Sequence, residues 1–238
     1  IYRKKFTLPK AIHDGPKEPV FLRVARHEGN ILIDLCDESW QVVEVSATGW
    51  RVLPRSPVAF IRTASMQALP MPVAPGRGSM QPLWALLNVT PNQRPLVVGA
   101  LISGFHPEGP FYVLNLVGEQ GTAKSSATRM MRRILDPNTV DLCSPPQKPD
   151  DLVAQAVNNR CVVFDNLSGL PPWLADSICR LSTGGGFSGR QLYTNAGEFS
   201  VALKRPVIIN GIDDVASRPD LAERTLQIEL QPIPDNRR

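Results

Sequence analysis

A run of small, basic and hydroxyl residues at 118–126 has the composition of a polyphosphate-binding loop. It reads Gly118-Glu119-Gln120-Gly121-Thr122-Ala123-Lys124-Ser125-Ser126. Glycines let successive backbone N–H groups turn toward phosphate oxygens, a lysine neutralises the outer phosphates, and the hydroxyl that follows it can hold Mg²⁺. We therefore predict that these nine residues bind a nucleotide through its phosphates and Mg²⁺.

Such a loop needs a strand before it and a helix after it. The apolar run Phe111–Val117 predicts a buried strand, and the pattern that carries Met131 and Leu135 predicts a helix ending before Pro137. An ordinary Gly/Ser turn before a helix is the alternative interpretation. The agreement of strand, loop, lysine, hydroxyl and helix favours a Walker A phosphate loop.

One position departs from the usual pattern, because Ala123 stands where a glycine normally precedes the lysine. A methyl group there disfavours positive φ but allows a right-handed start to the helix. The same GxxGxAKS form resembles the Walker A loop of the minichromosome-maintenance helicases. We therefore interpret Ala123 as a variant that begins the helix with right-handed backbone angles.

Two later strands end in polar side chains. The run 160–166 predicts a strand ending at Asp165, and the run 206–210 predicts one ending at Asn210. Ligands of α/β sheets gather at the carboxyl ends of strands, so Asp165 is a candidate Mg²⁺ ligand, as in a Walker B strand, and Asn210 a candidate for orienting the attacking water. Alternatively, Asp165 caps a helix or sits in a turn, and Asn210 begins a turn with Gly211.

Arg224 precedes the last predicted strand, 225–230. It either pairs with Glu223 or Asp220 on the surface, which contributes little to stability, or acts as an arginine finger that reaches the γ-phosphate of the nucleotide bound to a neighbouring subunit.

The remaining elements complete an α/β pattern. The segment 93–105 predicts a helix with almost no charge, which we expect to be buried. A hairpin is predicted with its tip at 194–198. Further helices are predicted at 80–87, from 150 or 151 to 157, and at 171–181.

Residues 1–78 differ from the rest. Short runs of alternating apolar and polar residues predict strands at 20–24, 31–33, 40–45, 50–53 and 58–62. They suggest a small antiparallel sheet or barrel, whose function the sequence does not indicate. The Pro- and Gly-rich segment 69–78 predicts a linker, so the domains are expected at 1–78 and 79–238. The basic residues at 3–5 and 10 could contact nucleic acid, although such short runs are more often solvated surface.

Composition narrows the remaining choices. The chain has 238 residues, 42% of them hydrophobic, and a net charge of +4, which is too small by itself to indicate nucleic-acid binding. No apolar run has transmembrane length and no signal peptide opens the chain. Four cysteines without a CxxC pair predict reduced, mostly buried thiols in a cytoplasmic protein, and three scattered histidines disfavour zinc. A start at Ile1 suggests a piece of a longer polypeptide.

Residues 111–230 resemble the superfamily 3 helicases, a branch of the AAA+ ATPases in viral and mobile-element replication. The matching segments are GEQGTAKS, CVVFDN, GGGFSGRQLY before a hairpin, PVIIN and LAERTLQIEL, in the family's order. The third looks most like the phage and poxvirus-type primase-helicases. The resemblance implies a parallel sheet with helices on both faces, a homo-oligomeric ring, usually a hexamer, ATP between subunits and single-stranded DNA in the channel, with a primase region or another replication partner nearby.

The resemblance also implies individual roles. Lys124 and Ser125 would bind phosphate and Mg²⁺, Asp165 the metal, Asn210 the attacking water, and Arg224 would act in trans. Two features depart from the family. Asn166 stands where an acid usually serves as general base, so it would position water, or Glu119 or Glu198 would take the proton. The hairpin tip lacks a lysine or histidine to grip DNA; Arg190, Lys204 and Arg205 are nearby, but are at least as well explained as solvated charges.

Three hypotheses follow. The leading one is the DNA-dependent ATPase or helicase module of a phage or mobile-element replication protein. The second is a non-translocating ATP-driven switch, loader or assembly factor, which Asn166 and the hairpin tip favour. A small-molecule kinase is third, because no acceptor-binding segment or basic lid follows the loop.

Overall fold

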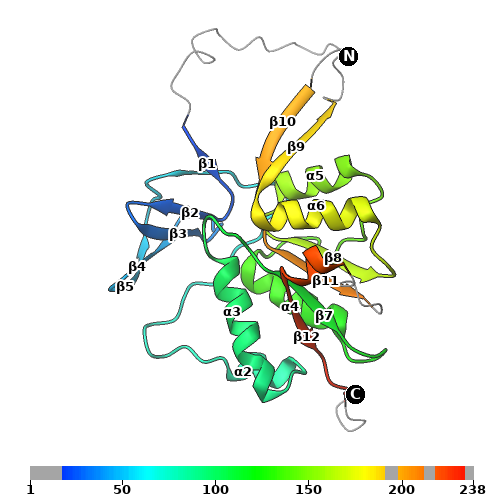
Figure 1. Ribbon diagram of the computed structural model, residues 1–238. Coiled ribbons are helices and arrows are strands. Elements are labelled where there is room, and N and C mark those ends of the chain that lie inside the picture. Colours follow the sequence, from blue (N-terminus) through cyan, green and yellow to red (C-terminus); the bar gives the residue numbers. More distant parts are fainter. Residues whose placement is uncertain (1–17, 191–197, 212–217, 234–238) are drawn as a thin grey trace, which may run out of the picture.

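The computed structural model describes residues 18–190, 198–211 and 218–233, without the side chains of 188–190 and 198–199. These residues form a small antiparallel sheet near the N-terminus and a parallel sheet with helices on both faces (Figure 1). The α/β fold class predicted from the sequence is confirmed.

The parallel sheet has four strands in the order β12-β7-β11-β8. They are β7 (Val113–Val117), β8 (Val162–Leu167), β11 (Val207–Gly211) and β12 (Thr225–Glu229). The two central strands, β7 and β11, are buried along almost their whole length, which explains why they read as continuous apolar runs. All four carboxyl ends therefore meet at one edge, where the phosphate loop begins.

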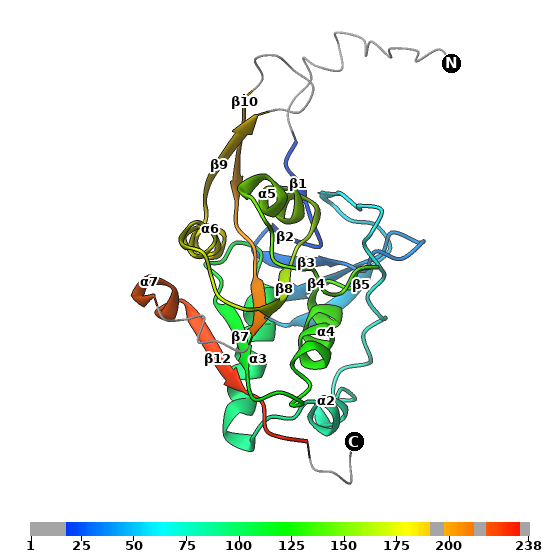
Figure 2. The ribbon, with the colours of Figure 1, turned by 90° about the vertical axis from the view of Figure 1, so that its right-hand side faces the viewer.

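Helices cover both faces of this sheet. Figure 2 shows the sheet between α6 and α4. The helices α5 (Pro149–Asn158) and α6 (Pro172–Thr183) pack on one face through Leu152 and Ile178. The helices α3 (Arg94–Gly104) and α4 (Lys124–Leu135) pack on the other. Shorter elements complete this core: α2 (Gln81–Leu86), a 3-10 turn (Pro91–Gln93) and α7 (Pro219–Ala222).

The prediction that the helix within 93–105 is buried is wrong. Val97 and Leu101 of α3 face the core, but Leu96 is 41% exposed and Ile102 is 68% exposed. Low charge alone cannot tell a buried helix from one with an apolar outer face, because only one stripe of α3 packs against β12 and α4.

The predicted hairpin is present as β9 (Gly185–Arg190) and β10 (Glu198–Leu203). The two strands pair antiparallel from Gly185 opposite Leu203 to Arg190 opposite Glu198, and they project beyond α5 and α6 (Figure 1). Most of the predicted tip, 194–197, lies outside the described residues. Arg205, at the base of the hairpin, is half-buried and donates from Nε to the Ala156 carbonyl at 2.8 Å, so it is not a solvated charge.

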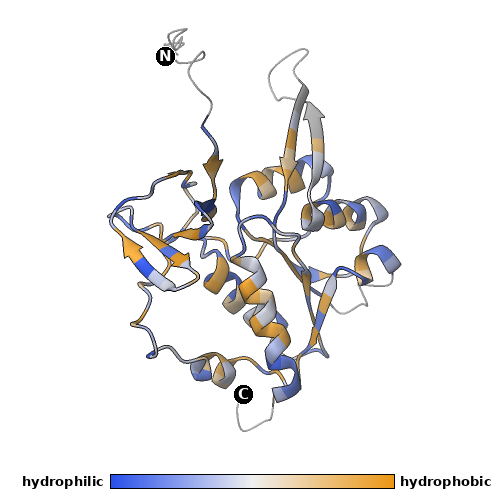
Figure 3. Cartoon of the chain, turned by 60° about the vertical axis from the view of Figure 1, so that its left-hand side comes forward, coloured by the Kyte–Doolittle hydropathy of each residue, from blue (hydrophilic) through white to orange (hydrophobic). Residues whose placement is uncertain are grey.

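The N-terminal sheet, residues 18–62, is called the β module here. Its meander has the order β2-β3-β4-β5 and is flanked by a parallel pair of two-residue strands, β1 and β6. The strands carry hydrophobic and hydrophilic residues side by side (Figure 3). The elements are β1 (Val20–Phe21), β2 (Val24–His27), β3 (Asn30–Asp34), β4 (Val42–Ser46), β5 (Gly49–Leu53) and β6 (Ala59–Phe60).

Arg23 interrupts the strand predicted at 20–24. Its φ of 59° is left-handed, which breaks the run between β1 and β2, and its side chain is fully buried. The guanidinium donates from Nε to Asp136 Oδ1 at 3.2 Å and also to the carbonyls of Asp34, Gln67 and Pro137. The break therefore turns Arg23 toward the parallel-sheet core.

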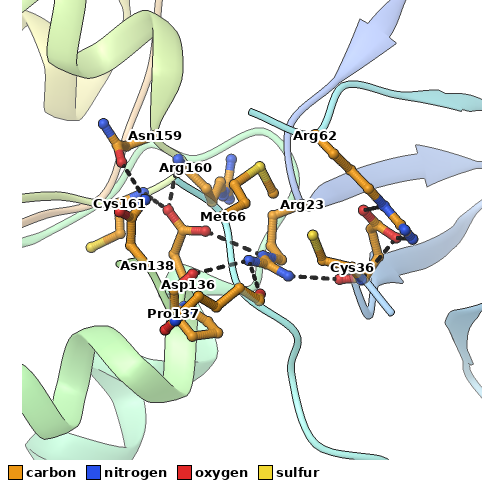
Figure 4. Close-up of polar contacts among 12 residues, drawn as sticks. Arg23, Cys36, Arg62, Met66, Asp136, Pro137, Asn138, Asn159, Arg160 and Cys161 are labelled. Carbon is orange, nitrogen blue, oxygen red and sulfur yellow. Dashed lines mark hydrogen bonds and ion pairs between the residues drawn. The ribbon is translucent and has the colours of Figure 1, made fainter. Parts of the chain in front are cut away.

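Asp136 lies at the other side of this contact, directly after α4. It is fully buried, and its Oδ2 accepts from the backbone N–H groups of Arg160 and Cys161 at 2.9 and 3.1 Å (Figure 4). Next to it, the backbones of Met66 and Asn138 form an isolated antiparallel β-bridge. The β module is thus attached at the end of the phosphate-loop helix and at the start of β8.

Residues 67–78, which include the predicted linker, contain no helix or strand. The boundary at residue 78 stays a prediction.

The four cysteines are free. Cys161 is buried, whereas Cys36, Cys143 and Cys179 are half-buried, so the expectation of mostly buried thiols is wrong. Burial raises the pKa of the Cys161 thiol to about 12. Among the described residues, no helix is long and apolar enough to cross a membrane.

Candidate nucleotide site

The loop between β7 and α4 is wound through three residues with positive φ. They are Gly118 at 150°, Gly121 at 85° and Ala123 at 63°. A side chain at Gly118 would meet the Leu230 carbonyl at 2.8 Å, so only glycine fits there. The prediction that Ala123 starts the helix with right-handed angles is wrong. The loop geometry requires a left-handed residue at this point, and Ala123 adopts it against the preference of its Cβ.

Lys124 folds back over this loop. Its Nζ donates to the carbonyls of Gly118 at 2.6 Å and Glu119 at 2.9 Å. The first turn of α4 contains no acidic residue, so the positive end of the helix dipole is unopposed. Lys124 and the helix start therefore make the loop a favourable place for an anion.

The remaining loop residues differ in their exposure to solvent. Thr122 is buried and its hydroxyl donates to the Glu119 carbonyl at 2.9 Å. Glu119, Gln120 and Ser126 are exposed.

Three predicted site residues meet at the carboxyl edge of the sheet. Ser125 Oγ donates to Asp165 Oδ1 at 2.8 Å, and Asn210 Nδ2 donates to the same oxygen at 2.7 Å. Asn210 is buried, and its Nδ2 also donates to Thr128 Oγ1 at 2.6 Å. Thr128 in turn donates to the Lys124 carbonyl at 2.9 Å. The loop helix and the ends of β8 and β11 are thus joined through one carboxylate.

This cluster has the chemistry of a Mg²⁺ site. The hydroxyl of Ser125 and the carboxylate of Asp165 are oxygen donors that converge on one point, and Mg²⁺ usually takes one or two such protein ligands beside phosphate and water. The residues present therefore fit the metal that the sequence predicts.

Asn166 joins the cluster only through its backbone. Its N–H donates to Asn210 Oδ1 at 2.9 Å, and its φ of 58° turns the chain. Its side chain is exposed and lines a cavity of about 610 Å³ together with Gln147 and Trp173, to which no residue of the phosphate loop contributes. The structure therefore does not bring the Asn166 amide to Lys124 or Ser125. The side chain of Glu198, an alternative base, lies outside the described residues.

Arg224 lies at the opposite edge of the sheet. Its carbonyl accepts from the Val113 N–H at 2.8 Å, at the start of β7, whereas the loop follows Val117. Four strand steps of about 3.3 Å separate these ends by roughly 13 Å. Its guanidinium donates to the backbone carbonyl of Asp220 rather than to a carboxylate, so Arg224 is far from the phosphate loop of its own chain.

Residues 81–238 match a family described as the actinomycete integrative conjugative element replication protein. The chain belongs to this family. A search of curated proteins found no match. Among solved structures, this replication protein is similar to a JCV helicase crystallised with a thiazolopyridinyl-phenoxyphenyl acetamide, at 12% identity and a TM-score of 0.43. The alignment covers 60% of this replication protein and 42% of that helicase chain.

A second cavity of this replication protein lies beside the phosphate loop. Its volume is about 190 Å³, and six of its eight lining residues are apolar. The lining residues come from α2 and the turn after it, from the loop, from α4 and from the segment after β12: Ala85, Leu86, Asn88, Thr122, Ala123, Ala127, Met130 and Ile233.

Sequence reasoning missed this cavity and missed Thr128. The cavity unites segments that are distant in sequence and carry no motif. Thr128 had a signal, because it stands four residues after Lys124 and therefore on the same face of α4.

Proposed function

We propose that this replication protein is the ATP-hydrolysing motor module of a DNA helicase or translocase, which assembles into a ring and acts on single-stranded DNA in the cytoplasm. The observation that carries the proposal is the joint contact of Ser125 and Asn210 with Asp165 Oδ1, at 2.8 and 2.7 Å, next to the phosphate loop. This contact supports a metal site directly beside a loop that would hold the nucleotide phosphates.

In this proposal each residue has one task. Lys124 exchanges the two loop carbonyls for phosphate oxygens, and its charge offsets theirs. Ser125 and Asp165 hold Mg²⁺, which would neutralise charge that develops on the phosphates. Asn210 would orient the attacking water, for which its amide must exchange a hydrogen bond to Thr128 or Asp165 for one to the water. The 190 Å³ cavity would take part of the adenosine.

A second copy of the chain completes the site. Arg224 lies at the edge of the sheet remote from its own loop, so we propose that it acts as an arginine finger at the loop of a neighbouring subunit. The subunits would form a ring, which is usually a hexamer in the superfamily 3 helicases that the sequence resembles. The projecting β9–β10 hairpin would face DNA in the channel. An organisation like that of primase-helicases, with a priming region or another replication partner, is part of the same proposal.

ATP turnover with and without single-stranded DNA tests the proposal. We expect DNA to stimulate hydrolysis and Lys124→Ala to abolish it. Lys148→Ala is the matched control, because Lys148 is an exposed lysine that lies ahead of α5 and outside the phosphate loop. Hydrolysis that ignores DNA would contradict the helicase function, and hydrolysis that survives Lys124→Ala would contradict the site.

Assembly is tested separately by the mass in solution with and without ATP and DNA. A particle that stays monomeric under all of these conditions would contradict the ring and the role of Arg224 in trans.

One observation favours the second candidate, a non-translocating ATP-driven switch or loader. Asn166, an amide, follows the carboxylate of Asp165, and its side chain lines a cavity to which the loop does not contribute, so the site lacks an acid at that position. Asn166→Glu separates the two candidates. Faster hydrolysis in this variant would mean that the native site turns over slowly, as a switch does, whereas an unchanged or lower rate favours the motor.

A further inference from the structure

Trp40 is exposed on the β module in a costly backbone conformation. Its side chain is 54% exposed, and its φ of 58° is left-handed, which is rare for a bulky residue. The turn that starts at Asp37 holds it there, because the Trp40 N–H donates to the Asp37 carbonyl at 3.3 Å. Such strain is typical of positions that functional use maintains.

Arg62 fixes the indole in place. The guanidinium carbon lies 3.8 Å from the centroid of the Trp40 ring, a cation–π contact. Arg62 is held by Asp34, with Nε and Nη2 donating to its two carboxylate oxygens at 3.0 and 2.6 Å. One face of the indole is therefore supported by a rigid ion pair, and Figure 4 shows Arg62 beside the contact with Arg23.

The ring also lines a cavity of about 500 Å³. Its lining includes Trp40 and Phe60 as aromatic walls, Ser39 as a polar group, and the charged residues Asp34 and Arg55. The carboxylate of Asp34 is paired with Arg62 and does not oppose an anion. Arg55 is exposed, and among the described residues it makes no hydrogen bond or ion pair. The cavity thus offers an aromatic surface beside an unpaired positive charge.

We propose that this cavity binds one nucleotide unit of single-stranded DNA, with the base stacked on Trp40 and its phosphate at Arg55. The inference rests on the proposed function for its DNA partner and adds the place of contact. Stacking on an aromatic ring and an arginine at the backbone are the two elements by which proteins hold single strands without reading sequence.

The charge of the cavity favours a strand over a free nucleotide. Arg55 is the one cation among the lining residues, so a nucleoside triphosphate would leave most of its phosphate charge unopposed. A strand presents a single phosphate per base, which matches one arginine.

The test is binding of the full chain to a fluorescent oligodeoxythymidine of about 12 nucleotides, measured by anisotropy. Trp40→Ala should raise Kd about tenfold, which corresponds to about 1.4 kcal/mol, and Trp40→Phe should restore most of the affinity. Arg55→Ala should weaken binding and reduce its salt dependence. Arg51→Ala is the matched control, because Arg51 lies on β5 and is paired with Glu44 at 2.5 Å.

A second readout locates the contact. An oligonucleotide containing 5-iododeoxyuridine should cross-link under ultraviolet light to the peptide that carries Trp40, and excess unlabelled oligodeoxythymidine should prevent this, whereas ATP should not. Binding and cross-linking that survive Trp40→Ala would overturn the inference alone, and competition by ATP would assign the cavity to a free nucleotide. A wild-type chain that binds no oligonucleotide would overturn the inference and the DNA part of the proposed function together.

Discussion

Replacing Asp136 by asparagine should lower the free energy of unfolding of this protein substantially. Asp136 is fully buried and is the carboxylate partner of the equally buried Arg23. An asparagine keeps one oxygen for the backbone N–H groups of Arg160 and Cys161, but its amide NH₂ then faces the Arg23 Nε–H, so two donors oppose each other. A buried charge is left without a counter-ion.

The magnitude follows from what Arg23 retains. Breaking a buried ion pair by removing one partner typically costs 3–5 kcal/mol. Because three backbone carbonyls, those of Asp34, Gln67 and Pro137, still accept from Arg23, we expect the low end, about 3 kcal/mol. Folded domains have about 5–15 kcal/mol in total, so this loss is large.

Urea denaturation followed by tryptophan fluorescence measures the change. The control is Glu108→Gln, which breaks the exposed Arg26–Glu108 pair at 2.9 Å, also between the β module and the core. We expect that variant to lose at most about 1 kcal/mol. Adding Arg23→Met to Asp136→Asn should recover part of the loss, because the uncompensated charge is then removed. An Asp136→Asn variant as stable as Glu108→Gln would refute the account of this contact.

Three further outcomes follow. Ala123→Gly should remove the left-handed strain at the head of α4 and raise the unfolding free energy by about 1 kcal/mol, seen as a higher Tm; an unchanged or lower Tm would count against the loop geometry. Lys124→Ala and Arg224→Ala should each be inactive alone, yet regain ATP hydrolysis when mixed, since each supplies what the other lacks; no recovery on mixing would mean that Arg224 does not act in trans. Burial raises the pKa of Cys161 from 9.0 to about 12, so the folded protein retains a proton that the unfolded chain releases, and the unfolding free energy should fall by about 1 kcal/mol between pH 9 and pH 10. Denaturation of Cys161→Ala at both pH values checks this, because that variant should show a smaller decline.

The order of the strands and helices along the chain could be predicted, because each element depends on the local pattern of apolar and polar residues. The buried strands β7, β8 and β11 are apolar runs, and the residues that end them come together since parallel strands share a carboxyl edge. The contact of Ser125 and Asn210 with Asp165 follows from the same rule, although the sequence did not show that one carboxylate oxygen would accept from both.

What could not be predicted depends on contacts between distant segments. Arg23 sits in an alternating run typical of a strand, and only its distant partner Asp136 explains the break there. The left-handed angles of Ala123 are imposed by the closed loop against the local preference of alanine. The outward face of α3 depends on which neighbours cover it, and low charge does not report that.

The pairing of Arg23 with Asp136 also limits how the chain can be divided. The β module has only a few fully buried apolar residues in its own cluster, Ala25, Leu32 and Val42, so it draws stability from its attachment to the larger core. A fragment starting at residue 79 would leave Asp136 with its arginine removed, and the isolated module would carry Arg23 without its acid. Separating the two sheets would therefore leave one unpaired buried charge in each fragment.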